Sequence, residues 1–549
     1  MTMTTKTLLS LAVAAVLLTV GVSRPWARTQ QAALSDLEHQ VDRVFERWSS
    51  ATPGCAVAVS VDGQRILSRA YGMADLEHDV ANTPDTIFEA GSVSKQFTAA
   101  AVLLLARDGK LSLDDPARKY VPELADYGSP LTIRHMLNHT SGLRDWGSVA
   151  GIAGWPRTTR VYSHAHVLDI VARQRSLNFT PGTRWSYSNT GYNLAAVIVS
   201  RVSGMSFADF TRQRLFEPLG MTRTSWRDDY GRIVKNRAMS YSGDGTVYRT
   251  VMPFENVHGN GGLLTTVGDL LKWNQNFVAP TVGDQGFVAE QERAGRFNDG
   301  RVHGYALGLQ VGTYKGLREI SHGGATAGYR AYLSHYPEAK TAVALLCNAA
   351  SVTPETSAHA VADVVLSSRL KETTLTPALQ LEAKSLEPML GTYRNVETGA
   401  PIRLASTDTG IRIERGPSFV PMAPGRFASA QGDALEIEGA RVRVTDAYGT
   451  TTPFERVTTD APSEAQLKSL VGTYRSDEAE VEMVVAIVGG NLVLKRRPDV
   501  TIALTPSYGD VFSGSIGVVR FHRDAGRVTG FSVVQDRVWD LRFTRQAGT

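Results

Sequence analysis

The sequence is poor in cysteine, since only Cys55 and Cys347 occur among its 549 residues. So low a count excludes a disulfide-rich scaffold and a four-cysteine zinc site. Both cysteines lie in apolar runs typical of strands, residues 55–59 and 342–347. Two interpretations are open: two buried free thiols, or a disulfide if the first and last strands of one sheet are neighbours.

Basic runs are also missing from the chain. The formal net charge is only +4, and no stretch of lysine and arginine interleaves with aromatic residues. We therefore expect no nucleic-acid partner.

Long hydrophobic runs are confined to the N-terminus. Lys6 precedes an apolar stretch over residues 8–22, and Arg24 and Arg28 follow it. This stretch is shorter than the ~20 residues that a membrane-spanning helix needs, so the layout predicts a signal peptide over residues 1–27 and a secreted or periplasmic protein. An uncleaved N-terminal anchor is the alternative, and we expect membrane contact only in that case.

Several catalytic signatures are absent. No serine lies in a G-x-S-x-G setting, which argues against an α/β-hydrolase. The glycine-rich bend at residues 259–263 lacks the Lys-Ser/Thr ending of a phosphate-binding loop. His135 and His139 have a spacing that zinc ligands use, but Met136 stands where an H-E-x-x-H motif has its glutamate. We expect neither a metal nor a cofactor.

The chain is long enough for two or three domains, and its apolar content of 42% is ordinary for a globular protein. An amphipathic helix over residues 33–49, two strands joined at Asp62-Gly63 and a further helix predict an α+β domain over residues 33–370. A polar linker over residues 371–386 follows. The Gly-Thr-Tyr-Arg sequence at 391–394 recurs at 472–475 and predicts two small antiparallel β-barrels, over residues 387–460 and 461–549.

The most informative stretch is Ser92-Val-Ser-Lys95, followed by an apolar run with helical spacing. If a helix begins at Ser92, the hydroxyl and the amine share one face, and a nearby base can activate the hydroxyl as a nucleophile. Burial and the positive end of the helix both lower the pKa of a lysine, so that it can be that base. A second copy, Ser368 and Lys371, ends a helical run and leads into the linker, which indicates chance.

Two later segments add polar groups in turn-rich surroundings. Tyr187 and Asn189 follow the Pro181-Gly182 turn and are expected on an ordered loop. His322, Gly323 and Gly324 precede a predicted strand, and glycines there allow a substrate backbone to approach.

Taken in order, Ser92-x-x-Lys95, Tyr187-x-Asn189 and His322-x-Gly324 resemble the penicillin-recognising serine hydrolases. This family includes class C β-lactamases, D-Ala-D-Ala carboxypeptidases, D-aminopeptidases and related esterases. The resemblance implies a β-lactamase/transpeptidase-like α+β domain, in which an antiparallel sheet is flanked by helices. A catalytic domain followed by two small barrels is most similar to D-aminopeptidases.

The resemblance also implies roles for the site residues. Ser92 would be acylated, and Lys95 and Tyr187 would share proton transfer. Asn189 would hold the carbonyl side of the substrate, with His322 and Gly324 beside it. The backbone N–H groups of Ser92 and Ala325 would form the oxyanion hole.

His322 stands where carboxylate-binding members of the family usually have lysine. Because a histidine with its reference pKa of ~6.5 is largely neutral at neutral pH, we expect weaker attraction of a free carboxylate here. The resemblance therefore favours a D-aminopeptidase-like amidase or a small-ester esterase with a small-molecule or peptide substrate. The alternatives are a class C-like β-lactamase or D-Ala-D-Ala carboxypeptidase, or an inactive sensor or cell-wall-binding protein.

Overall fold

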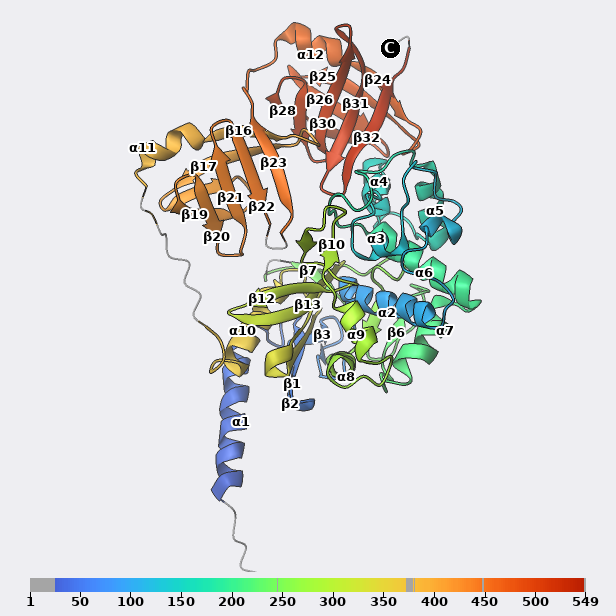
Figure 1. Cartoon of the computed structure of the whole chain (residues 1–549), viewed down its shortest axis with the longest axis vertical. Helices are drawn as coiled ribbons and strands as arrows, with labels where there is room; N and C mark the ends of the chain where they lie inside the picture. Colours follow the sequence, from blue (N-terminus) through green and yellow to red (C-terminus); the bar gives the residue numbers. More distant parts are fainter. Residues whose placement is uncertain (1–24, 244, 372–378, 380, 447–448, 548–549) are drawn as a thin grey trace, which may run out of the picture.

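The structure is a computed structural model that describes residues 25–243, 245–371, 379, 381–446 and 449–547. Most of the predicted signal peptide lies outside these residues, as do residues 372–378 and 380 of the predicted linker. Figure 1 shows a mixed helical and sheet region built from the first two thirds of the chain and two C-terminal sheets beside it.

The first region contains an antiparallel six-stranded sheet. All but one of its neighbouring strand pairs are hairpins, and in the remaining pair the first strand of the sheet in chain order lies beside the last. Its order is β12 (Gln310–Tyr314), β13 (Leu317–Thr326), β14 (Tyr329–Tyr336), β15 (Thr341–Cys347), β1 (Cys55–Val61), β2 (Gln64–Tyr71). The turn between β1 and β2 falls at Asp62 and Gly63, which both have positive φ, as the sequence predicted. The first and last strands pair, with Cys55 opposite Cys347, and the two sulfurs form a disulfide.

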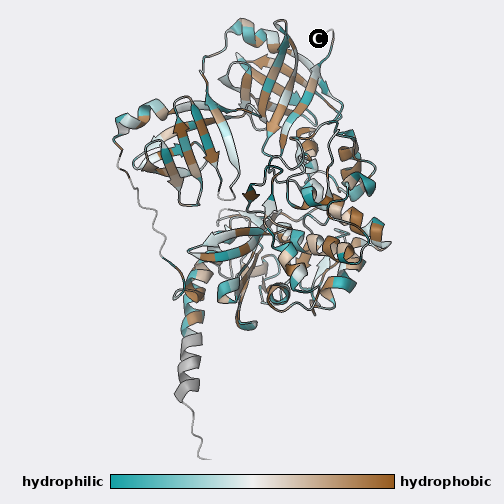
Figure 2. Cartoon of the chain, viewed as in Figure 1, coloured by the Kyte–Doolittle hydropathy of each residue, from teal (hydrophilic) through white to brown (hydrophobic). Residues whose placement is uncertain are grey.

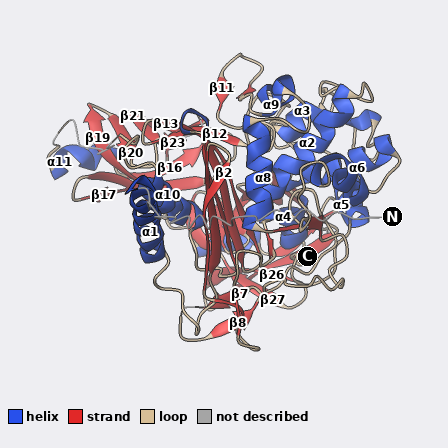
Figure 3. Ribbon diagram, turned by 90° about the horizontal axis from the view of Figure 1, so that it is seen from below, coloured by secondary structure: helices blue, strands red, loops and turns tan. Residues whose placement is uncertain are grey.

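Helices cover both faces of this sheet (Figure 3). Val57 and Val59 point to one face and pack with α1 (Pro25–Val44) and α10 (Pro354–Val365). Ala56 and Ala58 point to the other face, because side chains alternate along a strand, and belong to the larger core. That core contains residues of α2 (Ser94–Arg107), α4 (Trp146–Ile152), α5 (His164–Arg173), α6 (Asn189–Ser203), α7 (Phe207–Thr211), α8 (Val267–Val278) and α9 (Gln285–Gln291), together with α3 (Ile133–Leu137).

Short elements connect these layers. The strands are β3 (Met73–Asp75), β4 (Val80–Ala81), β5 (Phe88–Glu89), β6 (Ser225–Trp226), β7 (Tyr241–Gly243), β8 (Tyr248–Thr250), β9 (Leu263–Thr265), β10 (Gly295–Arg296) and β11 (Val302–His303). The short helical turns are η1 (Gly91–Val93), η2 (Ala117–Lys119), η3 (Arg212–Phe216), η4 (Pro337–Ala339) and η5 (Glu387–Met389).

The first C-terminal sheet is a closed barrel of eight strands. They are β16 (Gly391–Asn395), β17 (Pro401–Thr407), β18 (Gly410–Ile413), β19 (Ser418–Ala423), β20 (Arg426–Ser429), β21 (Ala434–Glu438), β22 (Arg441–Thr445) and β23 (Thr451–Arg456), preceded by α11 (Ala383–Leu386). Figure 2 shows hydrophobic and hydrophilic residues along the same strands, as expected where one face is buried and the other is wet.

The second C-terminal sheet has nine strands and stays open between its two ends, β27 and β28. It consists of β24 (Gly472–Ser476), β25 (Val481–Val488), β26 (Asn491–Arg496), β27 (Val500–Ala503), β28 (Thr505–Tyr508), β29 (Val511–Gly514), β30 (Gly517–Asp524), β31 (Arg527–Gln535) and β32 (Val538–Arg545), after α12 (Glu464–Leu470). The sequence repeat has a structural counterpart: the Tyr393 hydroxyl donates to the Met389 carbonyl at 2.9 Å, and the Tyr474 hydroxyl donates to the Leu470 carbonyl at 2.7 Å.

No single helix within the described ranges is long and apolar enough to cross a membrane. The helical segments Asn189–Ser203 and Phe207–Phe216, bent by 81°, pass the length and composition test only as a pair.

Candidate active site

Ser92 lies in a tight turn, not at the start of the α-helix as predicted. The residues Gly91–Val93 form the 3-10 turn η1, and α2 begins at Ser94. Gly91 has a φ of 51°, a conformation that glycine adopts without strain. Lys95 is therefore the second residue of α2, one turn after Ser92, and its Nζ atom lies 3.1 Å from Ser92 Oγ.

Three groups surround the buried amine of Lys95. Its Nζ atom lies 3.0 Å from Asn189 Oδ1 and 2.7 Å from the Asn260 carbonyl oxygen, in addition to Ser92 Oγ. Burial lowers the pKa of Lys95 well below its ordinary value, and the positive charge of Arg537 lowers it further, whereas Asp145 opposes the shift. An amine held this way can be neutral and can accept a proton.

Tyr187 approaches Ser92 from the other side. Its hydroxyl donates a hydrogen bond of 2.8 Å to Ser92 Oγ. Burial raises the pKa of Tyr187 to about 12, so the phenol holds its proton at neutral pH. Ser92 Oγ is therefore placed between one group that can accept a proton and one that can donate it.

Asn189 is the first residue of α6, and the prediction of a loop at this position was wrong. The Asn189 backbone N donates to Asp145 Oδ2 at 2.8 Å, so a carboxylate accepts one of the unpaired N–H groups at the start of the helix. This anchor fixes the start of α6 next to Lys95.

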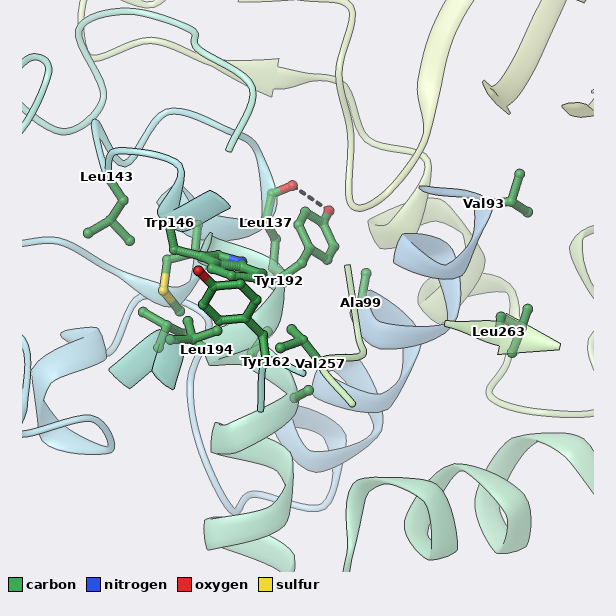
Figure 4. Packing of buried hydrophobic residues seen from close by; sticks show 14 of the residues in the cluster. Val93, Ala99, Leu137, Leu143, Trp146, Tyr162, Tyr192, Leu194, Val257 and Leu263 are labelled. Atoms are coloured by element: carbon green, nitrogen blue, oxygen red, sulfur yellow. Dashed lines mark hydrogen bonds between the residues drawn. The ribbon is translucent and has the colours of Figure 1, made fainter. Parts of the chain in front are cut away.

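The packing behind the site holds α6 in place (Figure 4). The Tyr192 hydroxyl donates to the Leu137 carbonyl at 2.6 Å, and Trp146 Nε1 donates to Asn193 Oδ1 at 2.8 Å. Asn193 Nδ2 in turn donates to Asn260 Oδ1 at 2.6 Å. The same helix thus positions Asn189 and the Asn260 loop, both of which contact Lys95.

Strand β13 brings the third predicted segment to the site. A Cβ atom on Gly324 would lie 2.1 Å from the Ala90 carbonyl oxygen, and one on Gly91 would lie 2.6 Å from the backbone N of Ala325. Only glycine permits so close an approach of the two backbones. The Ser92 turn and the Ala325 backbone therefore lie side by side.

A comparison with known proteins decides the family. A sequence profile of the beta-lactamase family matches residues 36–366, more than half of the chain. The chain belongs to the beta-lactamase family.

Known relatives extend the similarity beyond that domain. The D-aminopeptidase of Brucella ovis is 27% identical over 504 residues, which cover 88% of this chain and 93% of the relative. A penicillin-binding protein homologue from Pyrococcus abyssi has a TM-score of 0.55 at 23% identity and covers 77% of this chain and 100% of its own. The D-amino acid amidase from Ochrobactrum anthropi SV3 has a TM-score of 0.52 at 23% identity and covers 61% of this chain and 99% of its own. This beta-lactamase-family protein is a serine hydrolase.

His322 is a neutral member of the site in this beta-lactamase-family protein. Its Nδ1 atom lies 2.6 Å from the Gly323 carbonyl oxygen, which can only accept, so Nδ1 carries the proton. Its Nε2 atom then accepts from the Tyr305 hydroxyl at 2.9 Å. Burial lowers the pKa of His322 to about 3. Strand β13 therefore brings no positive charge to the position where a lysine is usual in carboxylate-binding relatives.

The two histidines with zinc-like spacing have other roles. The Thr132 backbone N donates to His135 Nδ1 at 3.3 Å, so His135 caps its own helix. The His139 ring packs at a tilt against the Tyr187 ring, with ring centres 4.3 Å apart, and its Nδ1 atom accepts from the Ser188 backbone N at 3.2 Å. Within the described part of the chain, no group of three or more His, Cys, Asp or Glu side chains could hold a metal ion.

One wall of the site comes from the second C-terminal sheet, which sequence reasoning missed. The turn between β31 and β32 reaches the catalytic domain, where the Arg537 carbonyl oxygen accepts from the Asp145 backbone N at 3.2 Å and from Asn178 Nδ2 at 3.1 Å. The Arg537 guanidinium lies 4.6 Å from the centre of the Tyr187 ring.

Further contacts fix this hairpin. The Ser186 hydroxyl donates to the Asp536 carbonyl at 3.2 Å, and Trp539 packs on Phe179 with ring centres 4.9 Å apart. Arg144, which is buried, pairs with Glu478 at 2.8 Å. The sequence of this hairpin does not predict these contacts, because its turn has the residues of an ordinary exposed turn.

Proposed function

We propose that this protein is an exported serine hydrolase that forms an acyl-enzyme on Ser92 and releases the N-terminal residue from D-amino acid peptides or amides. The position of Ser92 Oγ, 3.1 Å from Lys95 Nζ and 2.8 Å from the Tyr187 hydroxyl, carries the proposal. The similarity to a D-aminopeptidase over nearly the whole chain supports the substrate class.

The first step is acylation, and the contacts of Lys95 suit it. A neutral amine has two N–H groups and one lone pair, and Asn189 Oδ1 and the Asn260 carbonyl accept the two N–H groups. The lone pair then faces Ser92 and takes the hydroxyl proton as Oγ attacks the substrate carbonyl carbon. The backbone N–H groups of Ser92 and Ala325 stabilise the negative charge on the carbonyl oxygen.

Collapse of this intermediate breaks the bond to the leaving amine. The amine nitrogen takes a proton from Tyr187, and the phenolate that results regains one from the ammonium of Lys95, so that both groups return to their starting protonation. In deacylation a water molecule gives a proton to Lys95 and attacks the ester carbon. Tyr187 gives a proton to the departing Ser92 Oγ, the acid is released, and Lys95 returns the proton to Tyr187. Ser92 recovers its hydroxyl, so one water is consumed for each bond cleaved.

The experiment compares hydrolysis of D-alanyl p-nitroanilide, p-nitrophenyl acetate and nitrocefin by the wild type, Ser92→Ala and Ser368→Ala. Ser368 is the matched control, because it belongs to the second S-x-x-K sequence but follows α10, whereas the contacts of Lys95 and Tyr187 are with Ser92. We expect the anilide to be cleaved best, Ser92→Ala to lose activity and Ser368→Ala to keep it. Activity retained by Ser92→Ala would refute the acyl-enzyme.

Export rests on the bond between Cys55 and Cys347, because structural disulfides form in oxidising compartments. Cell fractionation and the intact mass of the mature protein test it. Recovery of the protein in the cytoplasm with the residue 1–27 segment intact would contradict export.

A further inference from the structure

Arg537 is a cation without a carboxylate partner at the edge of the active site. Within the residues that the structure describes, no aspartate or glutamate lies within 4.0 Å of its guanidinium. Asp145, whose backbone N binds the Arg537 carbonyl, directs its own two carboxylate oxygens to the backbone N–H groups of Ser148 and Asn189. The main chain of Arg537 is thus anchored, while its guanidinium lies over the Tyr187 ring and has no carboxylate partner among the described residues.

The cavity next to this guanidinium has about 970 Å³ of volume and is walled by all three parts of the molecule. Trp185 comes from the catalytic domain, Ile402 from the first barrel and Val534 from the second sheet. Two arginines line it. Arg184 pairs with Glu397 at 2.5 Å, whereas Arg537 has no such partner.

The direction of Arg537 indicates which end of a substrate it meets. Its guanidinium lies over the Tyr187 ring, and the hydroxyl of the same ring contacts Ser92 Oγ. If Tyr187 protonates the departing amine, Arg537 stands on the leaving-group side of the scissile bond. In a dipeptide with a free C-terminus, the carboxylate is separated from that amine nitrogen by a single carbon.

We propose that Arg537 binds the free C-terminal carboxylate of the leaving group, so that the preferred substrates are D-dipeptides. This inference rests on the proposed function and narrows its substrate class. The planar guanidinium can give two parallel hydrogen bonds to a carboxylate. It supplies the positive charge that neutral His322 does not bring to the site.

The test compares two substrates with the same scissile bond, D-alanyl-D-alanine and D-alanyl-D-alaninamide, by following loss of each intact dipeptide. In the wild type we expect kcat/KM to be about 10- to 100-fold higher for the free acid, the size of a charge-assisted hydrogen bond. In Arg537→Gln we expect the ratio to fall to about one. The change comes chiefly from a higher KM for the acid, because the carboxylate is bound equally in the ground and transition states. Arg537→Lys keeps part of it, and the matched control Arg184→Gln keeps all of it.

The ratio of the two kcat/KM values distinguishes loss of carboxylate binding from general damage to the site, since a distorted site slows the cleavage of both substrates equally. A second measurement needs no variant: salt should lower kcat/KM for the acid and leave the amide unaffected, because only the acid uses an ionic contact. A wild-type ratio near one, or an unchanged ratio in Arg537→Gln, would overturn the proposal.

Failure of the proposed function gives a different result. If the wild type cleaves neither dipeptide, a fluorophosphonate that labels Ser92 still reports on binding. Stronger protection of Ser92 by the acid than by the amide, lost in Arg537→Gln, supports the carboxylate site without D-peptidase activity. Equal protection by both dipeptides would reject it.

Discussion

Replacing Tyr187 by phenylalanine should separate the two proton transfers at Ser92. The pKa of Tyr187 is raised to about 12, so at pH 8 only about one phenol in ten thousand is ionised. The resting enzyme therefore has a tyrosine that donates and a Lys95 whose lowered pKa lets it accept. A departing amide nitrogen needs a proton, whereas p-nitrophenolate leaves without one.

We expect Tyr187→Phe to lower kcat/KM for D-alanyl p-nitroanilide by about 10²- to 10⁴-fold, the usual contribution of one positioned proton donor. For the p-nitrophenyl ester of D-alanine the loss should be less than about tenfold. The ratio kcat/KM is the right measure, because it reports acylation without deacylation. Lys95→Met serves as the comparison and should impair both substrates. Equal large losses for anilide and ester in Tyr187→Phe would refute the division of roles.

Three further predictions concern stability. Replacing both Cys55 and Cys347 by alanine opens a link across a sequence separation of 292 residues and should lower the free energy of unfolding by roughly 2–5 kcal/mol; an unchanged urea midpoint would contradict this. Arg227→Met leaves the buried Glu89 carboxylate without its 2.8 Å partner and should cost about 3–5 kcal/mol, most of which the double variant with Glu89→Met recovers; simple additivity of the two single losses would reject the coupling. The pKa of His322 is about 3 in the folded protein and ~6.5 in the unfolded chain, so the unfolded chain binds a proton first as the pH falls. The free energy of unfolding should therefore decrease between pH 6.5 and pH 3, by about 1.4 kcal/mol per pH unit. When urea unfolding is measured at several pH values, the free energy of unfolding should fall less steeply with decreasing pH in His322→Gln than in the wild type. The same pH dependence in both proteins would show that this imidazole is not held neutral.

The sequence was sufficient to predict that Ser92, Lys95 and Tyr187 lie together, because each is part of a short segment with its own local pattern. Ser92 and Lys95 share one turn, and Tyr187 follows a turn that proline and glycine enforce. The exact element at each position was harder to predict. Gly91 takes a positive φ and shifts the helix start to Ser94, and Asp145 lets α6 begin at Asn189.

Contacts between distant segments could not be predicted in this way. The pairing of Cys55 with Cys347 depends on β1 and β15 being neighbours, which neither strand shows by itself. The repeated Gly-Thr-Tyr-Arg sequence predicts two similar sheets, yet only the first one closes. Arg537 has no motif at all, since its importance comes from the docking of one sheet against another domain.

The hairpin between β31 and β32 has a consequence for how the enzyme matures. Ser92 and Lys95 are synthesised long before Arg537, whose guanidinium lies over the Tyr187 ring. A polypeptide that ends before residue 537 would lack the hairpin that places this guanidinium beside Tyr187. The carboxylate preference that we propose for Arg537 therefore depends on translation of the second C-terminal sheet, and a shorter polypeptide lacks it.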